Sequence, residues 1–205
     1  MNHLRTLFIG FFLTFITSWV GLVIMPYIQL GHLPPFEDED EGTSNPPALT
    51  GLEITGMKAY AANGCIYCHT QQVRPSHQGS DIARGWGGRR TVARDYINQK
   101  PVFLGTMRTG PDLTNVGVRL RDKRWHHEHL YNPQSKVSWS TMSPYKYLYR
   151  KQKIEGDPSP DALLEVGEKI EEGFEIIPTE EAKALVAYLL SLNRSYPLPE
   201  APFDE

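Results

Sequence analysis

The most apolar part of the chain is one continuous segment near its start. Residues Leu7–Leu30 contain no Asp, Glu, Lys, Arg or His. About 20 apolar residues cross the hydrocarbon core of a bilayer, so this length predicts a membrane-spanning helix. A cleaved signal peptide would have a shorter apolar core and a small-residue cleavage site, which the sequence Met25–Ile28 does not offer. We therefore predict an uncleaved membrane anchor over residues 1–30.

The charges on either side of this segment predict its orientation. Arg5 precedes the span and the acidic run 37–41 follows it. The positive-inside rule then leaves the N-terminus in the cytoplasm and everything after Gly31 outside. One face of the predicted helix carries only small and hydroxyl residues, namely Gly10, Thr14, Thr17, Ser18 and Gly21. Such a face favours docking against a partner helix bundle, with a lone anchor as the alternative.

The remaining pattern predicts an all-α fold with long loops. Residues 31–50 are rich in Pro, Gly and acidic side chains and are expected to form an extended linker. A domain is expected over 51–195, followed by a C-terminal tail over 196–205. Capping residues, apolar faces and stop signals predict helices over about 50–63, 123–131 and 159–173 and a last one after Thr179. Few convincing alternating strands are found.

Two of these helices have a predicted buried face. In the first helix it is formed by Leu52, Met57, Tyr60 and Ala61. In the last helix it is formed by Leu185, Tyr188, Leu189 and Leu192. Both sets follow the spacing of an amphipathic helix, so these two helices are expected to contribute to the core.

Charge and cysteine content narrow the classes of function. The net charge of −3 argues against a nucleic-acid-binding protein, which normally has a basic surplus. Two cysteines exclude a disulfide framework, and they cannot alone complete a four-cysteine zinc site.

Both cysteines belong to one motif. Residues 65–69 read Cys-Ile-Tyr-Cys-His, a c-type haem attachment sequence. Two thiols one turn apart can form thioethers with both vinyl groups of one haem, which places His69 under the iron as an axial ligand. A thioredoxin-like pair would need a βαβ context, a zinc site would need two more ligands, and a disulfide at this spacing is strained. We predict one covalent haem c, which is also expected to organise the irregular stretch 70–122.

A second axial ligand separates electron transfer from open-site chemistry. Methionine opposite histidine closes the iron and raises its potential. Met142 lies in a polar, proline-containing loop over 140–145, where a methionine is a poor core filler. We therefore favour Met142 as the second ligand, with Met107 as the alternative.

Two further clusters have plainer interpretations. The run Trp125–His129 contains three histidines but no pair with the i, i+4 spacing of a helical metal site, so a packing helix is predicted. Four arginines surround Trp86, and they are candidates for haem propionates, a partner subunit or a solvated face: Arg84, Arg89, Arg90 and Arg94.

Three sequence blocks, in this order, resemble the monohaem subunit II of cbb3-type cytochrome c oxidases. They are Gly64–Pro75, Arg108–Leu113 and His129–Pro133, and with the anchor the similarity reaches about Tyr147. The last helix is compatible with the class I cytochrome c fold. The family usually has proline directly after its ligand methionine, whereas this chain reads Met142-Ser143-Pro144.

The resemblance implies the residues of the site. Haem c would be attached to Cys65 and Cys68 and ligated by His69 and Met142. The carbonyl of Pro111 would accept a hydrogen bond from the ring N–H of His69 and fix its orientation. No catalytic residue is implied.

The resemblance also implies a function, location and partners. The chain would be a non-catalytic subunit that passes single electrons from a dihaem cytochrome c subunit to the haem b of the large haem–copper subunit. It would cross the bacterial inner membrane once, with its haem domain in the periplasm. The alternatives are a free-standing anchored cytochrome c that shuttles electrons, and an open haem with peroxidase-like chemistry.

Overall fold

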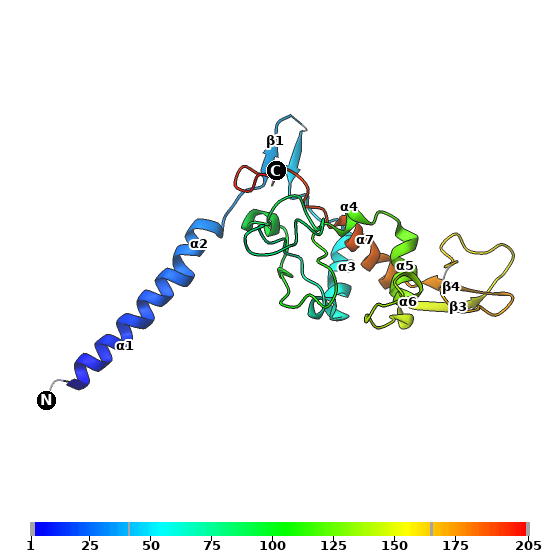
Figure 1. Cartoon of the computed structure of the whole chain (residues 1–205), viewed down its shortest axis with the longest axis horizontal. Coiled ribbons are helices and arrows are strands. Elements are labelled where there is room, and N and C mark those ends of the chain that lie inside the picture. The colour runs from blue at the N-terminus through cyan, green and yellow to red at the C-terminus, as the bar shows by residue number, and fades with distance from the viewer. Residues whose placement is uncertain (1–2, 41, 165, 204–205) are drawn as a thin grey trace. The chain divides into compact units, whose positions relative to one another are not determined.

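A computed structural model of the chain describes residues 3–40, 42–164 and 166–203 (Figure 1). These residues form two compact units. The first contains residues 3–47 and 92–100, and the second contains residues 48–91 and 101–203.

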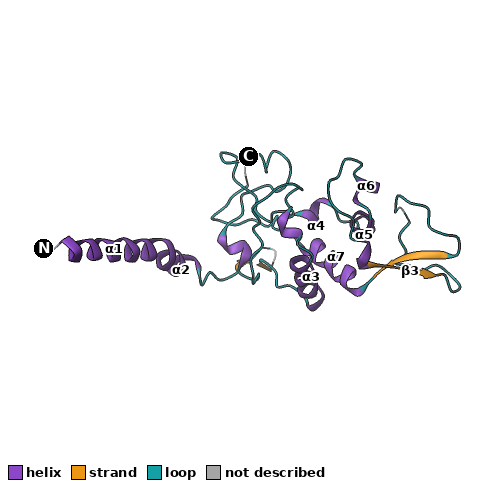
Figure 2. Ribbon diagram, turned by 90° about the horizontal axis from the view of Figure 1, so that it is seen from below, coloured by secondary structure: helices purple, strands orange, loops and turns teal. Residues whose placement is uncertain are grey.

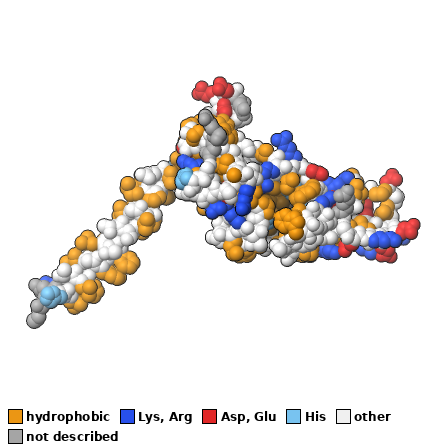
Figure 3. All heavy atoms as spheres, in the orientation of Figure 1, with side chains coloured by type: hydrophobic (Ala, Val, Ile, Leu, Met, Phe, Trp, Pro, Cys, Tyr) orange, Lys and Arg blue, Asp and Glu red, His pale blue; other side chains and the backbone are white. Residues whose placement is uncertain are grey.

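The first unit begins with the expected apolar helix. It consists of α1 (His3–Trp19), a π-helical turn (Val20–Ile24) and α2 (Met25–Leu30). The whole helix has 28 residues and is long and apolar enough to cross a membrane. Figure 3 shows apolar side chains along it.

The interior of this helix explains its wide turn and its polar face. Pro26 has no N–H to bond the carbonyl four residues earlier, and next to it the N–H of Met25 bonds the carbonyl of Val20 instead. The hydroxyls of Thr14 and Thr17 donate to carbonyls of their own helix, at 2.9 Å and 2.7 Å. Both hydroxyl hydrogens are therefore bonded within the helix. Thr14 and Thr17 thus allow another helix to approach closely, but they do not donate hydrogen bonds to it.

The predicted linker is more structured than an extended chain. Strand β1 (Phe36–Asp38) pairs antiparallel with β2 (Thr43–Asn45). Residues 92–100, which include a 3₁₀ turn over Ala93–Tyr96, belong to the same unit, and the Asn98 side chain donates to the Pro46 carbonyl at 2.8 Å. The composition of this segment gave no sign of these pairings. Glu41, the end of the acidic run, lies outside the described residues.

The second unit is built on α3 (Gly51–Ala62) and α7 (Glu180–Ser191). Thr50 and Thr179 cap these helices as their side chains accept backbone N–H groups of the first turn. The predicted face of α7 is buried throughout: Leu185, Tyr188, Leu189 and Leu192.

The predicted face of α3 is only half right. Met57 and Tyr60 are buried, but Leu52 and Ala61 are exposed. The buried face is set by Gly56, where an added Cβ would lie 1.9 Å from the carbonyl oxygen of Ala184. The helices cross with their backbones in contact at this glycine, which moves the interface away from Leu52.

Four shorter elements stand between these helices. They are α4 (Val116–Arg119), α5 (Lys123–Tyr131) and α6 (Pro133–Lys136), and a 3₁₀ turn over Lys146–Leu148. The bounds of α5 match the prediction. Strand β3 (Tyr149–Lys153) pairs antiparallel with β4 (Phe174–Pro178), so the expected all-α fold is not confirmed (Figure 2).

The helix predicted over 159–173 is also wrong. Ser159 closes a single turn by accepting the N–H of Ala162 at 3.0 Å. The next two N–H groups then leave the helical path: Leu163 donates to the carbonyl of Ile176 and Leu164 donates to the carboxylate of Glu128. Tertiary partners therefore replace the helical ones that the local signal predicted.

The long stretch 70–91 and 101–122 is irregular, as expected, but buried polar side chains order it. Asp81 accepts hydrogen bonds from the backbone and side chain of Arg74 and from Arg108. Asn115 donates to the carbonyl of Trp86 at 2.9 Å and accepts the N–H of Arg194 at 2.7 Å. The protein thus supplies much of the order that the sequence assigned to a haem.

Candidate haem site

The attachment motif begins where α3 ends. Gly64 adopts the left-handed conformation at φ 70, which turns the chain out of the helix without strain. A 3₁₀ turn over Cys65–Tyr67 follows, and the N–H of His69 bonds the carbonyl of Cys65 at 3.0 Å. Cys65 is buried, Cys68 is exposed, and the two are not joined by a disulfide. Burial raises the pKa of the Cys65 thiol to about 11.

The imidazole of His69 has one nitrogen fixed. Its Nδ1 lies 2.8 Å from the carbonyl oxygen of Pro111. A carbonyl can only accept, so Nδ1 carries the hydrogen and Nε2 keeps a free lone pair. Burial lowers the pKa of the imidazole, and the Pro111 carbonyl partly opposes that shift. The neutral ring is the form that binds a metal.

Gly110 lies against the face of the same ring. A Cβ at this position would lie 2.3 Å from Cε1 of His69, and the Gly110 N–H bonds the carbonyl of Cys68 at 2.9 Å. Only a residue without a side chain fits here, so backbone rather than side chain supports the imidazole.

A buried carboxylate joins the two segments of this site. Asp112 accepts from the Thr70 hydroxyl at 2.5 Å and from the N–H groups of Gln72 and Thr114, each at 2.8 Å. The N–H of Leu113 also bonds the carbonyl of Thr70 at 2.8 Å. These bonds fix the register of the Pro111 carbonyl relative to His69.

The loop with Met142 packs against the apolar cluster that contains Cys65. Met142 is partly buried against the main apolar cluster. Tyr145, three residues later, donates its N–H to the carbonyl of Leu130 at 2.9 Å. The pKa of Tyr145 is raised to about 12, by burial first and then by the nearby thiols of Cys65 and Cys68. The loop is thereby placed beside the attachment motif.

Met107 lies in a segment that runs along His69. Its side chain is 57% exposed. A glycine lies on each side of Met107 in the sequence. A Cβ at Gly105 would lie 2.7 Å from the His69 carbonyl oxygen, and Gly110 lies against the His69 ring. This placement favours Met142 over Met107 for a ligand opposite His69.

Two further buried polar atoms belong to this region, one on Arg119, which the sequence analysis did not single out, and one on His129, which it assigned to a packing helix. Arg119 Nε and His129 Nδ1 have no hydrogen-bond partner among the described residues. Arg119 donates through Nη2 to the carbonyl of Asp112, and His129 stacks on Trp125 at 4.7 Å. Buried polar atoms without partners are costly, and a carboxylate-bearing cofactor would satisfy them. Two thiols, an imidazole with a free Nε2 and a thioether therefore fit a haem with its propionates.

The two other predicted clusters have structural roles. No group of three or more His, Cys, Asp or Glu in the described part of the chain could hold a metal ion. In α5, His126 Nε2 donates to the carbonyl of Leu120 at 2.8 Å. Arg89 is buried and donates to the carbonyl of Tyr196 at 2.9 Å, so the arginine cluster is largely a scaffold.

Comparison with known families decides the class of protein. The family described as "Cytochrome C oxidase, mono-heme subunit/FixO" matches residues 6–175. The chain belongs to this family. The match covers the apolar helix, the attachment motif and the Met142 loop, and it confirms the resemblance to a cbb3 oxidase monohaem subunit. Comparison with curated proteins gave no significant match.

Membership of the FixO family gives the coarse function. The family implies one haem, electron transport and a subunit of a cytochrome c oxidase complex with partner subunits. The N-terminal apolar helix fits a single-pass membrane anchor.

A substitution at Gly110 tests whether the backbone of this segment holds the His69 ring in place. In Gly110→Ala the new methyl group would displace the imidazole from the Pro111 carbonyl. Loss of such an orienting bond costs a metal site about tenfold or more, so we expect about a tenfold lower yield of haem-loaded chain. The measurement is haem absorbance per chain after purification in detergent. Gly51→Ala, which meets nothing within 4 Å, is the matched control, and equal yields for both variants would contradict this role.

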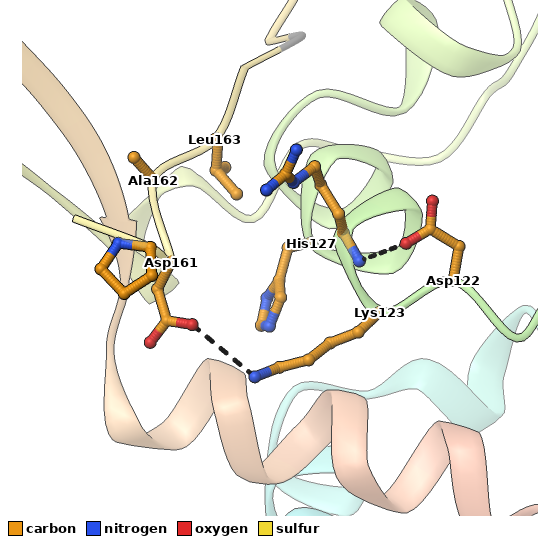
Figure 4. A pocket seen from close by; sticks show the side chains of 8 residues that line it. Asp122, Lys123, His127, Asp161, Ala162 and Leu163 are labelled. Carbon is orange, nitrogen blue, oxygen red and sulfur yellow. Dashed lines mark hydrogen bonds and ion pairs between the residues drawn. The ribbon is translucent and has the colours of Figure 1, made fainter. Parts of the chain in front are cut away.

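A second prediction concerns pH and the buried His127. Its Nδ1 lies 3.1 Å from the Tyr149 hydroxyl, and the ring lies beside the Lys123–Asp161 ion pair (Figure 4). Burial first, and then the charge of Lys123, lower the pKa of His127 from 6.5 to about 4. The unfolded chain therefore binds a proton that the folded chain does not, and stability falls as pH drops from about 6.5 to about 4.

This contribution should amount to about 1.4 kcal/mol per pH unit within that window. His127→Gln does not titrate, so its unfolding free energy should vary less steeply with pH between about 6.5 and 4. Denaturant unfolding of both proteins across this range measures the difference. Parallel pH profiles would show that His127 has the same pKa in the folded and the unfolded chain, and would contradict the prediction.

Proposed function

We propose that the chain is the electron-transfer subunit of a cbb3-type oxidase and passes single electrons through one covalent, six-coordinate haem c. The observation that carries this proposal is the His69 imidazole, held by Pro111 with Nε2 free, directly after two thiols in a FixO family member.

Each residue has a distinct task. Cys65 and Cys68 would form the two thioethers, and His69 Nε2 and the Met142 thioether would be the axial ligands. A haem c held in this way supplies a one-electron Fe(II)/Fe(III) couple. Pro111 and Gly110 keep the His69 ring in one orientation, while partial burial of Met142 restricts water on the opposite side. Arg119 and His129 would receive the propionates.

The partners follow from the same proposal. Electrons would come from a dihaem cytochrome c subunit and go to the haem b of the large haem–copper subunit. The membrane segment Leu7–Leu30 contains no ionisable side chain, so it offers no route for protons. Oxygen reduction and proton pumping would therefore belong to the large subunit. The domain would lie on the periplasmic side of a bacterial inner membrane, because Arg5 precedes the span.

Substitution of Met142 and of Met107 tests which methionine is the second axial ligand. Met142→Ala should abolish the near-infrared charge-transfer band of methionine-ligated ferric haem and lower the reduction potential, because the thioether stabilises the reduced iron. Met107→Ala is the matched control and should leave both unchanged. The reverse pattern would assign Met107 instead. If neither variant changes the spectrum, methionine ligation is wrong.

Purification in mild detergent tests the assignment to a complex. Full-length chain should be recovered together with a large subunit that contains haem b and with oxygen consumption. Recovery of the chain alone, with one haem c, would favour the free-standing shuttle.

A further inference from the structure

The loop with Met142 is held at its start by one side-chain amide. Gln134, on α6, donates from Nε2 to the carbonyl of Ser140 at 2.8 Å and to the carbonyl of Met142 at 3.0 Å. Both acceptors lie in the segment that follows α6, and one of them is the carbonyl of Met142 itself. The amide therefore connects a short helix directly to the backbone of the methionine.

At its end this loop is fixed by the Tyr145 N–H, which bonds the carbonyl of Leu130 in α5, and between residues 138 and 142 the remaining hydrogen bonds are local. The N–H of Ser140 bonds the carbonyl of Val137 at 2.9 Å, and the N–H of Met142 bonds the Ser140 hydroxyl at 3.2 Å. These bonds close turns within the loop, but they do not fix the loop to the rest of the domain. Among the hydrogen bonds of residues 138–142 in the described part of the chain, those of Gln134 come from a helix side chain, and they act beside the apolar packing of Met142.

The base of this connection is firmly placed. Pro133, the first residue of α6, is buried. The side chain of Asn132 donates to the carbonyl of Val166 at 2.9 Å and so fixes the start of the same helix. Gln134 thus connects the packed part of the domain to a loop that contains the exposed Ser143 and Pro144.

We propose that Gln134 is a positioning residue for Met142, and that its two N–H donors hold the loop so that the thioether stays directed toward the iron. This inference rests on the proposed function, because it requires Met142 to be the second axial ligand. Gln134 itself does not touch the iron, and its effect is on how readily Met142 is displaced.

Glutamate and alanine replacements separate the donors from other effects. Gln134→Glu keeps the shape but has no N–H donor, whereas Gln134→Ala removes the donors without adding charge. Loss of both hydrogen bonds corresponds to roughly a tenfold change in an equilibrium. Gln78→Glu is the matched control for charge, because Gln78 is exposed and distant in sequence from this loop.

The experiment is a titration of the oxidised, haem-loaded full-length protein with imidazole. Imidazole competes with Met142 for iron, and the near-infrared methionine band reports the displacement. Both Gln134 variants should bind imidazole about tenfold more tightly than wild type, while Gln78→Glu should match wild type. Thermal unfolding of the same samples identifies any variant that is broadly unfolded.

Two results would overturn the proposal, and they can be told apart. If Met142→Ala loses the band but the Gln134 variants titrate like wild type, Met142 is the ligand and Gln134 does not position it. If wild type has no methionine band and Met142→Ala titrates identically, the ligand assignment fails and this inference fails with it. An effect of Gln134→Glu alone would be a charge effect and would also contradict the proposal.

Discussion

The orientation of one imidazole constrains much of the second unit. For Nδ1 of His69 to donate to Pro111, two segments 42 residues apart must lie side by side in one register. Gly110 has no side chain to push the two segments apart, and its N–H bonds the carbonyl of Cys68. The N–H of Leu113 bonds the carbonyl of Thr70, and the Asp112 carboxylate accepts three further hydrogen bonds. Together these contacts fix the register. Because these bonds are made by the protein, the ligand side of the site is preorganised.

This constraint also explains how a long irregular stretch is ordered. A segment with little regular structure has backbone and side-chain polar groups that must find partners when buried. Here Asp81 and Asp112 each accept from donors in more than one segment, and Asn115 donates to the Trp86 carbonyl and accepts the N–H of Arg194. The haem is thus not needed as the only organiser of 70–122, although Arg119 and His129 keep buried atoms for which the described residues supply no partner.

The sequence was informative where the signal was local. The apolar span, the threonine caps of α3 and α7, the bounds of α5 and the Cys-x-x-Cys-His motif all depend on neighbouring residues. It failed where distant partners decide, as in 159–173, where Leu163 bonds Ile176, and in the linker, where residues 92–100 pack. Leu52 was misplaced because the crossing point depends on Gly56 meeting Ala184.

The supporting residues of the site were the least predictable. The roles proposed for Arg119, His129 and Gln134 depend on contacts that no spacing rule describes. A buried arginine or histidine becomes conspicuous only when its unpaired nitrogen is seen, and Gln134 only when both of its acceptors are located. Motifs indicated the atoms that would touch the haem, and the structure was needed to find the residues that hold those atoms.

The most direct test of this account is peptide mass spectrometry of the purified full-length chain after denaturation and proteolysis. The account predicts that the peptide with Cys65 and Cys68 carries the mass of one haem and contains no free thiol. A peptide of unmodified mass with two free thiols, accompanied by haem that extracts into acidified solvent, would contradict it.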